Sequence, residues 1–270
     1  MKIAVLLSAH NDIKLVQDTL DSVKKYMTNN ILVMFDGAFW SEVENINIDS
    51  LKMKGMYHKT PKAPYRNIAL GLQKLYELFP DCDWYNCLEY DCLVASSHIK
   101  TTLEIAKEKD IWFLGNDGKI APNTNLPFLD LLLGGRIDKT ANYYALGCCQ
   151  FYSKKFIDNL IDRNFFEKFL NLTNYFTHGF YPFYNGYDIS EHLYPTLARV
   201  LGGKVAVLAS RDYKTGKWHG NYERYPMRWL PEIDISENYP EASILHPIKS
   251  FNHPIRKFYR KKRNDIRNNS

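Results

Sequence analysis

Apolar residues in the first third of the chain alternate between unbroken runs and helical spacing. Residues 3–8 and 31–35 are apolar runs, typical of central strands in a parallel sheet. Between them, residues 12–28 repeat apolar side chains every three or four positions, which predicts an amphipathic helix. A second such helix follows Pro64, and residues 84–89 form a third buried strand. This β-α-β-α-β order predicts an α/β protein with a mixed, mostly parallel sheet flanked by helices.

The second half of the chain is less regular. Helices are predicted over 97–108, 153–163, 165–173 and 189–201, the last one broken at Pro195, and strands over 111–114, 144–152 and 204–208. Residues 115–141 read as loop, with a short helix at 129–133, and the aromatic segment 174–186 reads as a binding loop. Without a linker or a repeat, we expect one domain over 1–254, with halves 1–95 and 96–254, and a basic tail over 255–270.

Polar side chains follow each of the three N-terminal strands, as Ser8-Ala9-His10-Asn11, Asp36-Gly37 and Glu89-Tyr90-Asp91. Because ligands of such sheets bind beyond the carboxyl ends of the strands, we expect these segments to converge. In an extended backbone, Glu89 and Asp91 would project from the same side. Two carboxylates so close repel each other unless a cation lies between them, and a divalent cation that carries phosphates is the usual partner. The pair therefore predicts a site for nucleotide phosphates.

Charge and cysteine content narrow the class of protein. The net charge is +5, but residues 255–270 hold seven Lys or Arg against Asp265, which leaves about −1 for residues 1–254. The body is therefore no basic surface for nucleic acid. Five cysteines without zinc-ligand spacing favour a reducing compartment over a disulfide framework. No apolar run approaches the roughly 20 residues of a membrane span, so we expect a cytoplasmic protein.

Several of these segments together resemble a known family. Residues 3–11, then Asp18-Thr19-Leu20-Asp21-Ser22-Val23, resemble the opening of family-2-type glycosyltransferases with the GT-A fold, a Rossmann-like fold. In that family Asp36 matches a nucleotide-contacting aspartate, and residues 66–72 resemble an "arg-asn-x-gly" helix start in which the glycine comes late. Glu89-Tyr90-Asp91 takes the place of the metal-binding acid-x-acid motif, with Glu where the family usually has Asp. The resemblance covers residues 1–95 and fades beyond them.

The resemblance implies transfer of a sugar from a nucleotide-diphosphate sugar, with Mn²⁺ or Mg²⁺ as cofactor. A divalent ion stabilises the negative charge that develops on the leaving diphosphate. Asp91 is the preferred direct ligand, and Glu89 would reach the metal through water or contact the ribose of the donor. The alternative is that both are solvated carboxylates at a strand end.

The other residues carried over to the donor site each have a structural alternative. Ala9 and Asn11 would contact the donor, but Asn11 could instead be the N-cap of the following helix and Ala9 a point of close backbone approach. Asp36 could be an ordinary Asp-Gly turn residue. Arg66, followed by Asn67, could bind a nucleotide phosphate or base, or lie on an exposed helix start.

An inverting transferase needs a general base that takes the proton of the acceptor hydroxyl. Asp188 and Glu191 follow the aromatic loop at the start of the predicted helix, and Glu191 is slightly preferred. Their spacing is also that of a capping box.

Residues near the C-terminal end of the chain are candidates to complete the metal site. Many metal-dependent enzymes of this fold complete the site with a late histidine, and His246 has that position, with His219 as competitor and His253 less attractive. Lys249 could reach a phosphate. The tail interleaves aromatic and basic residues, which could give peripheral contact with an anionic membrane, although a disordered, solvated terminus is the favoured interpretation.

The resemblance thus implies a metal-dependent glycosyltransferase, expected to be of inverting type, with a glycan, lipid-linked or protein acceptor. One alternative is a sugar-nucleotide nucleotidyltransferase, although residues 8–12 lack the glycine-rich basic loop that such enzymes carry after the first strand. The other is a non-catalytic carbohydrate-binding protein on the same scaffold.

Overall fold

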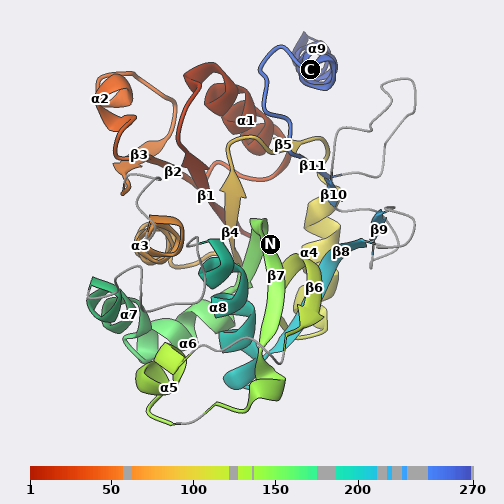
Figure 1. Ribbon diagram of the computed structural model, residues 1–270. Helices are drawn as coiled ribbons and strands as arrows, with labels where there is room; N and C mark the ends of the chain where they lie inside the picture. Colours follow the sequence, from red (N-terminus) through yellow and green to blue (C-terminus); the bar gives the residue numbers. More distant parts are fainter. Residues whose placement is uncertain are drawn as a thin grey trace.

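The computed structural model describes residues 1–56, 63–121, 127–135, 137–174, 187–211, 218–220, 227–229 and 243–268. Its centre is an eight-stranded sheet in the order β3-β2-β1-β4-β7-β6-β8-β9 (Figure 1). The strands are β1 (Ile3–Ala9), β2 (Ile31–Phe35), β3 (Leu51–Lys54), β4 (Trp84–Glu89), β6 (Ile111–Ile120), β7 (Tyr143–Ser153), β8 (Lys204–Arg211) and β9 (Trp218–Gly220). A smaller sheet in the order β10-β11-β5 combines β10 (Met227–Trp229), β11 (Ile244–His246) and β5 (Leu93–Val94).

The sheet is mixed and mostly parallel in its N-terminal half, as the sequence predicts. β3, β2, β1 and β4 run parallel to one another, β7 runs antiparallel to both β4 and β6, and β8 runs parallel to β6. The predicted α/β class with flanking helices is therefore confirmed. Residues 115–120 are a correction, because they continue β6 against β7 rather than starting a loop.

Successive side chains of β1 point to opposite faces of the sheet and so belong to two separate layers of the hydrophobic core. Ile3, Val5 and Leu7 pack with α1 (Ile13–Tyr26) and α4 (His98–Glu108) on one face. Ala4 and Leu6 pack with helices on the other face, namely α3 (Ala63–Leu78), α6 (Lys154–Asp162), α7 (Phe165–Asn174) and α8 (Tyr187–Val200). This period of two is what a strand buried on both faces requires.

Gly71 explains how α3 lies close to β1. A Cβ atom at this position would lie 2.3 Å from a methyl carbon of Leu6, so only glycine fits without a shift. The late glycine of the segment 66–72 therefore has a packing role. The remaining short elements are α2 (Trp40–Val43), α5 (Pro127–Leu133) and a 3₁₀ turn (Lys139–Ala141). Helix α8 runs without interruption through Pro195, where the sequence predicts a break.

The basic C-terminal segment is a helix packed on the domain, not a solvated tail. Helix α9 (Pro254–Asn268) lies beside α1 at the top of Figure 1. Arg256 and Arg263 of α9 are buried against Asp18 of α1, so the expected disorder of this segment is wrong. Among the described residues, no helix combines the length and apolar character needed to cross a membrane.

Candidate functional site

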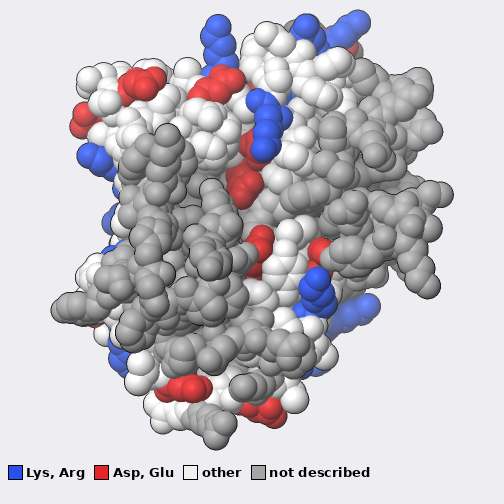
Figure 2. Space-filling model, viewed as in Figure 1, with Lys and Arg blue, Asp and Glu red and all other residues white. Residues whose placement is uncertain are grey.

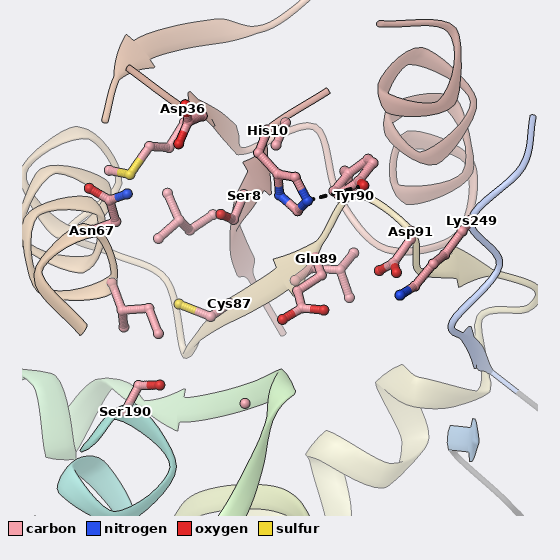
Figure 3. Close-up of a pocket in the computed structure, with 16 residues that line it drawn as sticks. Ser8, His10, Asp36, Asn67, Cys87, Glu89, Tyr90, Asp91, Ser190 and Lys249 are labelled. Atoms are coloured by element: carbon pink, nitrogen blue, oxygen red, sulfur yellow. Dashed lines mark hydrogen bonds between the residues drawn. The ribbon is translucent and has the colours of Figure 1, made fainter. Parts of the chain in front are cut away.

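A cavity of about 280 Å³ opens where the carboxyl ends of β1, β2 and β4 meet. The strand registers bring these ends together, since Ser8 pairs with Glu89 and Ala9 pairs with Phe35, the residue before Asp36. Polar residues from all three ends line the cavity, namely Ser8, His10, Asp36, Glu89, Tyr90 and Asp91 (Figure 3). Figure 2 shows acidic side chains gathered in the hollow at the centre of this face. The predicted convergence of the strand ends is confirmed.

The acid pair lies across a tight turn rather than along an extended strand. β4 ends at Glu89, and the amide of Cys92 donates a hydrogen bond to the carbonyl of Glu89 at 3.0 Å. Alternation along an extended strand therefore does not explain why the carboxylates of Glu89 and Asp91 lie on the same side of the chain. The turn does so, and we call residues 89–92 the acid loop.

His246 joins the acid pair from the far end of the chain. β11 pairs antiparallel with β5, and Leu245 lies opposite Leu93, so His246 comes to lie beside the acid loop. Its Nε2 atom is 3.1 Å from Glu89 Oε2 and 3.1 Å from Asp91 Oδ1. The three residues that the sequence proposes as metal ligands thus form one cluster.

The arrangement of this cluster fits a divalent cation. Asp91 Oδ1 is buried and lies 3.1 Å from the imidazole nitrogen of His246. Ligand atoms about 2.1 Å from an octahedral cation are about 3.0 Å apart at right angles, close to the spacing found here. Burial alone would raise the pKa of Asp91, but contact with His246 and the charges of Lys249 and Arg256 lower it below its ordinary value. Asp91 is therefore ionised at neutral pH.

The chemistry of the donors favours Mn²⁺ or Mg²⁺ over a thiolate-bound metal. Cys92 Sγ lies within 4.8 Å of the ligand atoms of Asp91 and His246, but it donates a hydrogen bond to the carbonyl of Cys148. Burial raises the pKa of Cys92 well above its ordinary value, so the group is a neutral thiol. Carboxylates suit hard cations such as Mg²⁺ and Mn²⁺, and an imidazole can also bind a transition metal, so the donor set fits a divalent cation.

Lys249 brings a cation to the same side of the cavity. It follows β11 by three residues, lines the cavity and is exposed. Figure 3 shows its ammonium group close to the Asp91 carboxylate, with Asp36 and Asn67 on the opposite side of the cavity. An exposed ammonium group here can meet a phosphate that a metal also holds.

Asp36 and Asn67 line the other end of the cavity, and each also has a structural contact. Asp36 Oδ1 accepts a hydrogen bond from the amide of Ala38 at 2.8 Å, so Asp36 is a turn residue, and its contact with a nucleotide stays a prediction. Asn67 accepts from the amide of Met56 at 2.8 Å and donates to its carbonyl at 3.3 Å. Both side chains are thereby fixed at the wall of the cavity rather than turned away from it.

The other predicted donor-site residues lie at different places. Ala9 lines the cavity and is buried. Asn11 is exposed and contacts Tyr90, while the N-cap of α1 is Asp12, whose carboxylate accepts from the amide of Leu15 at 3.1 Å. Arg66 is not among the residues that line the cavity. Its guanidinium donates to the carbonyl of Leu170 and the hydroxyl of Thr173, both in α7.

The start of α8 lies beside the cavity. Glu191 Oε1 accepts a hydrogen bond from the amide of Gly147 in β7 at 3.2 Å, and Gly147 lines the cavity together with Ser190. Figure 3 shows Ser190 across the cavity from the acid loop. Asp188 belongs to the same helix, but its side chain lies outside the described part of the structure, as does the aromatic loop 175–186.

Two aromatic residues at the strand ends were not predicted as site residues. Tyr90 OH and His10 Nε2 are 3.2 Å apart, and the two rings meet edge to face within the lining of the cavity. Burial, with a further effect of Asp91, raises the pKa of Tyr90 to about 12, so its hydroxyl stays protonated. The sequence signal that could have identified them is their position within the segments that follow β1 and β4.

Comparisons with known proteins give likeness of fold only. No family model and no curated protein matches the chain. Similar solved structures include the bifunctional IspDF from Campylobacter jejuni, at 13% identity and TM-score 0.42 over 80% of this chain and 51% of that one. A glycosyltransferase involved in glycosylation of the major capsid of PBCV-1 matches at 13% identity and TM-score 0.44, over 97% and 99% of the two chains. S. aureus TarS 1–349 in complex with UDP matches at 16% identity and TM-score 0.43, over 77% and 58%.

The chain spans about half the length of the first of these structures and 58% of the third. Glycosyltransferases and a bifunctional enzyme of another kind thus both occur among the similar folds. Because all three TM-scores are below 0.5, the function of this chain must be argued from its own residues.

Proposed function

We propose that this protein is a metal-dependent glycosyltransferase that uses a nucleotide-diphosphate sugar as donor. The observation that carries the proposal is the cluster of Glu89, Asp91 and His246, with Lys249 beside it, at the carboxyl-end cavity of the sheet. Asp36 and Asn67 at the other end of the cavity supply polar groups for the nucleoside. This polarity, a metal site at one end and hydrogen-bonding groups at the other, suits a nucleoside diphosphate.

The proposed roles follow from the position of each group. Glu89, Asp91 and His246 would hold the ion, which as a Lewis acid stabilises negative charge on the leaving diphosphate. Lys249 would contribute a second positive charge to the same oxygens. The protonated hydroxyl of Tyr90, hydrogen-bonded to His10, would donate a hydrogen bond within the cavity rather than act as a base.

An acceptor would enter from the side of α8. Glu191 is our proposed general base, because its carboxylate is anchored to the amide of Gly147 at the cavity wall, and Asp188 is the alternative. A base on this side, opposite the acid loop, would take the acceptor proton as the hydroxyl attacks the sugar from the face away from the diphosphate. The stereochemical result would be inversion, with a glycan, lipid-linked or protein hydroxyl as acceptor.

A nucleotidyltransferase is the second candidate, and one feature of the chain argues against it. Transfer of a nucleotidyl group places a triphosphate close to the first strand, where a glycine-rich basic loop would bind it. Residues 8–12 contain neither glycine nor Lys or Arg. A non-catalytic sugar-binding protein on a degenerate transferase scaffold is disfavoured by the intact acid pair Glu89 and Asp91.

Helix α9 offers a surface for peripheral contact with an anionic lipid bilayer. Lys257, Phe258, Lys261 and Lys262 of this helix are all exposed. Basic side chains around an exposed aromatic ring favour such a surface. Co-sedimentation with vesicles that contain phosphatidylserine, compared with pure phosphatidylcholine vesicles, would test this contact.

The experiment that tests the proposed function is a panel of nucleotide sugars assayed for nucleotide release. Each donor would be incubated with Mn²⁺, with Mg²⁺ or with a chelator, with and without simple sugar acceptors. We expect release of a nucleoside diphosphate from one donor class, dependent on metal. Formation of a nucleotide sugar from a sugar phosphate and a nucleoside triphosphate would instead support the nucleotidyltransferase.

A further inference from the structure

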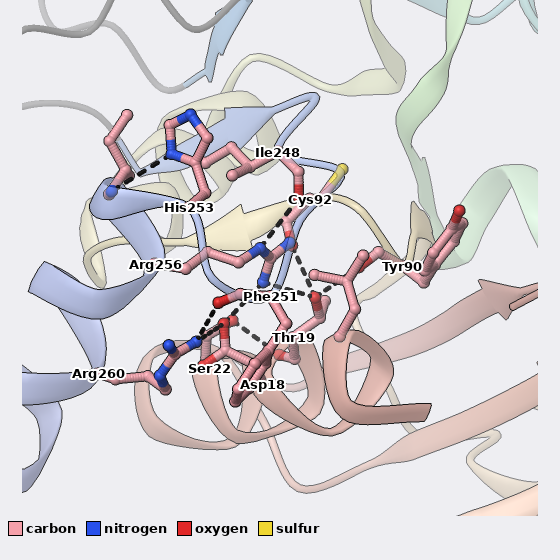
Figure 4. Close-up of polar contacts among 12 residues, drawn as sticks. Asp18, Thr19, Ser22, Tyr90, Cys92, Ile248, Phe251, His253, Arg256 and Arg260 are labelled. Carbon is pink, nitrogen blue, oxygen red and sulfur yellow. Dashed lines mark hydrogen bonds and ion pairs between the residues drawn. The ribbon is translucent and has the colours of Figure 1, made fainter. Parts of the chain in front are cut away.

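Three arginines of α9 surround one carboxylate in the interior of the protein, and Figure 4 shows two of them, Arg256 and Arg260, beside Asp18. Asp18 of α1 is 2% exposed, and Arg256 is fully buried with its NH1 atom 2.8 Å from Asp18 Oδ2. Arg263 also binds Asp18, and Arg260 lies 3.4 Å from it. This cluster is outside the cavity, and the proposed reaction has not used it.

Arg256 donates three hydrogen bonds beyond its ion pair. Its Nε atom donates to the carbonyl of Ile248 at 3.0 Å, and NH2 donates to the carbonyl of Cys92 at 2.9 Å. NH1 also donates to the hydroxyl of Thr19 at 3.1 Å. One guanidinium therefore contacts helix α1, the acid loop and the segment after β11.

Thr19 continues this connection to the acid loop. Its Oγ1 atom lies 2.6 Å from the carbonyl of Tyr90 and 2.8 Å from that of Cys92. These two carbonyls flank Asp91, whose own carbonyl accepts from the amide of Ile248 at 2.8 Å. The backbone on both sides of Asp91 is thus tied to Thr19, to Arg256 and to the segment that begins with His246.

We infer that Arg256 is a positioning residue for the metal site, which sets the distance between the acid loop and His246. The inference rests on the proposed function, because it requires that these groups bind a metal. The planar guanidinium has five N–H donors in a fixed geometry, so it can hold carbonyls of two separate segments at once. An ion pair that served only to attach α9 would need Asp18 alone.

The consequence is that the C-terminal helix is part of the metal site although none of its residues lines the cavity. Residues that orient metal ligands from outside typically change metal affinity by about 10- to 100-fold when they are replaced. Arg263 provides a matched comparison, because it also binds Asp18 from α9 while its described hydrogen bond reaches neither Ile248 nor Cys92.

The test is Mn²⁺ affinity of the full chain, measured by electron paramagnetic resonance of the free ion. Wild type would be compared with Arg256→Met, Arg256→Lys and Arg263→Met, after circular dichroism shows which variants are folded. We expect Arg256→Met to bind Mn²⁺ about 10- to 100-fold more weakly. Arg256→Lys should recover part of the loss, and Arg263→Met should stay within about threefold of wild type.

Thr19→Val gives a second test if Arg256→Met fails to fold. Valine keeps the shape of the buried threonine but removes the hydroxyl between Arg256 and the acid loop, so affinity should again fall. Equal Mn²⁺ affinity in wild type, Arg256→Met and Thr19→Val would overturn the inference, as would equal losses in Arg256→Met and Arg263→Met. Failure of the wild type itself to bind Mn²⁺ would overturn the proposed metal site, and the inference with it.

Discussion

The imidazole Nε2 of His246 lies 3.1 Å from the buried Oδ1 of Asp91, although the two residues come from distant parts of the chain. The antiparallel pairing of β11 with β5 creates this contact. It brings an imidazole nitrogen from the C-terminal region to the carboxylates of Glu89 and Asp91.

Replacement of His246 should change metal preference more than it changes folding. His246→Asn removes the imidazole ligand that favours a transition metal, so affinity for Mn²⁺ should fall more than affinity for Mg²⁺. We expect the ratio of activity with Mn²⁺ to activity with Mg²⁺ to drop at least about tenfold, in line with the effect of altering one metal contact. His253→Asn, four residues beyond Lys249, is the control and should keep the ratio of the wild type.

Metal binding should depend on pH in a defined direction. Burial alone would lower the pKa of His246, but Cys148, Asp91 and Glu89 raise it above its ordinary value. In the metal-free protein the imidazole is therefore protonated at pH 7, and a metal must displace that proton. Mn²⁺ affinity should rise by up to about tenfold per pH unit between pH 6 and 8.

The sign of the effect on stability follows from the same shift. A histidine with a raised folded-state pKa stabilises the metal-free protein below its unfolded pKa of about 6.5, and this stabilisation declines as pH rises towards the folded pKa. Metal affinity independent of pH over this range, from calorimetry in two buffers, would contradict the displacement of a proton.

Lys249 should affect donor binding rather than the choice of metal. Lys249→Gln removes a positive charge from the cavity beside Asp91, so the KM for the donor should rise roughly tenfold, as for loss of one charge-assisted hydrogen bond. Lys249→Arg should retain most of the affinity. Lys257→Gln, an exposed position of α9, should leave steady-state kinetics unchanged. An unchanged donor KM in Lys249→Gln would remove Lys249 from the site.

Glu191 and Asp188 can be distinguished by their amide variants. Glu191→Gln keeps an acceptor for the amide of Gly147 but removes the base, so kcat should fall by about 10²- to 10⁴-fold with little change in donor affinity. Asp188→Asn should have a small effect if Glu191 is the base. The reverse result, with a large loss only in Asp188→Asn, would transfer the role to Asp188.

Asp18 should be among the residues that matter most for folding stability. Asp18→Asn leaves Arg256 and Arg263 buried without their carboxylate, and loss of one partner of a buried ion pair costs about 3–5 kcal/mol. Denaturant unfolding followed by circular dichroism measures this loss. Asp21→Asn, on the same helix and hydrogen-bonded to Gln17, should cost less than about 1 kcal/mol. Similar stabilities of the two variants would contradict the account of the cluster.

The sequence was sufficient to predict the strand ends that form the cavity. It was insufficient to predict the tertiary contacts that distant residues make around them. Apolar runs followed by Ser8, Asp36 and Glu89 predict three neighbouring strand ends, because local pattern sets both strand and stop. His246 was assigned from its late position, but its contact with Asp91 depends on β11, a three-residue strand without a local signal. The reach of Arg66 to α7 likewise comes from tertiary packing.

The C-terminal helix is a second example of structure that the sequence did not predict. A run of Lys and Arg is ordinarily solvated, so the sequence favours a disordered tail. Only the three-dimensional arrangement shows that Arg256 and Arg263 bind Asp18, because nothing in the sequence pairs this residue of α1 with the C-terminal segment. Pairing of distant charges leaves no periodic pattern in the chain.

The most direct test of the central claim is stoichiometric Mn²⁺ binding in wild type and in Asp91→Asn, each with and without a nucleoside diphosphate. Asp110→Asn, an exposed carboxylate paired with Lys155, is the matched control. We predict one Mn²⁺ per chain in wild type and in Asp110→Asn, bound more tightly when nucleoside diphosphate is present. In Asp91→Asn we predict an affinity at least about 100-fold lower, since a direct ligand is lost. Equal Mn²⁺ binding by Asp91→Asn and wild type would contradict the account.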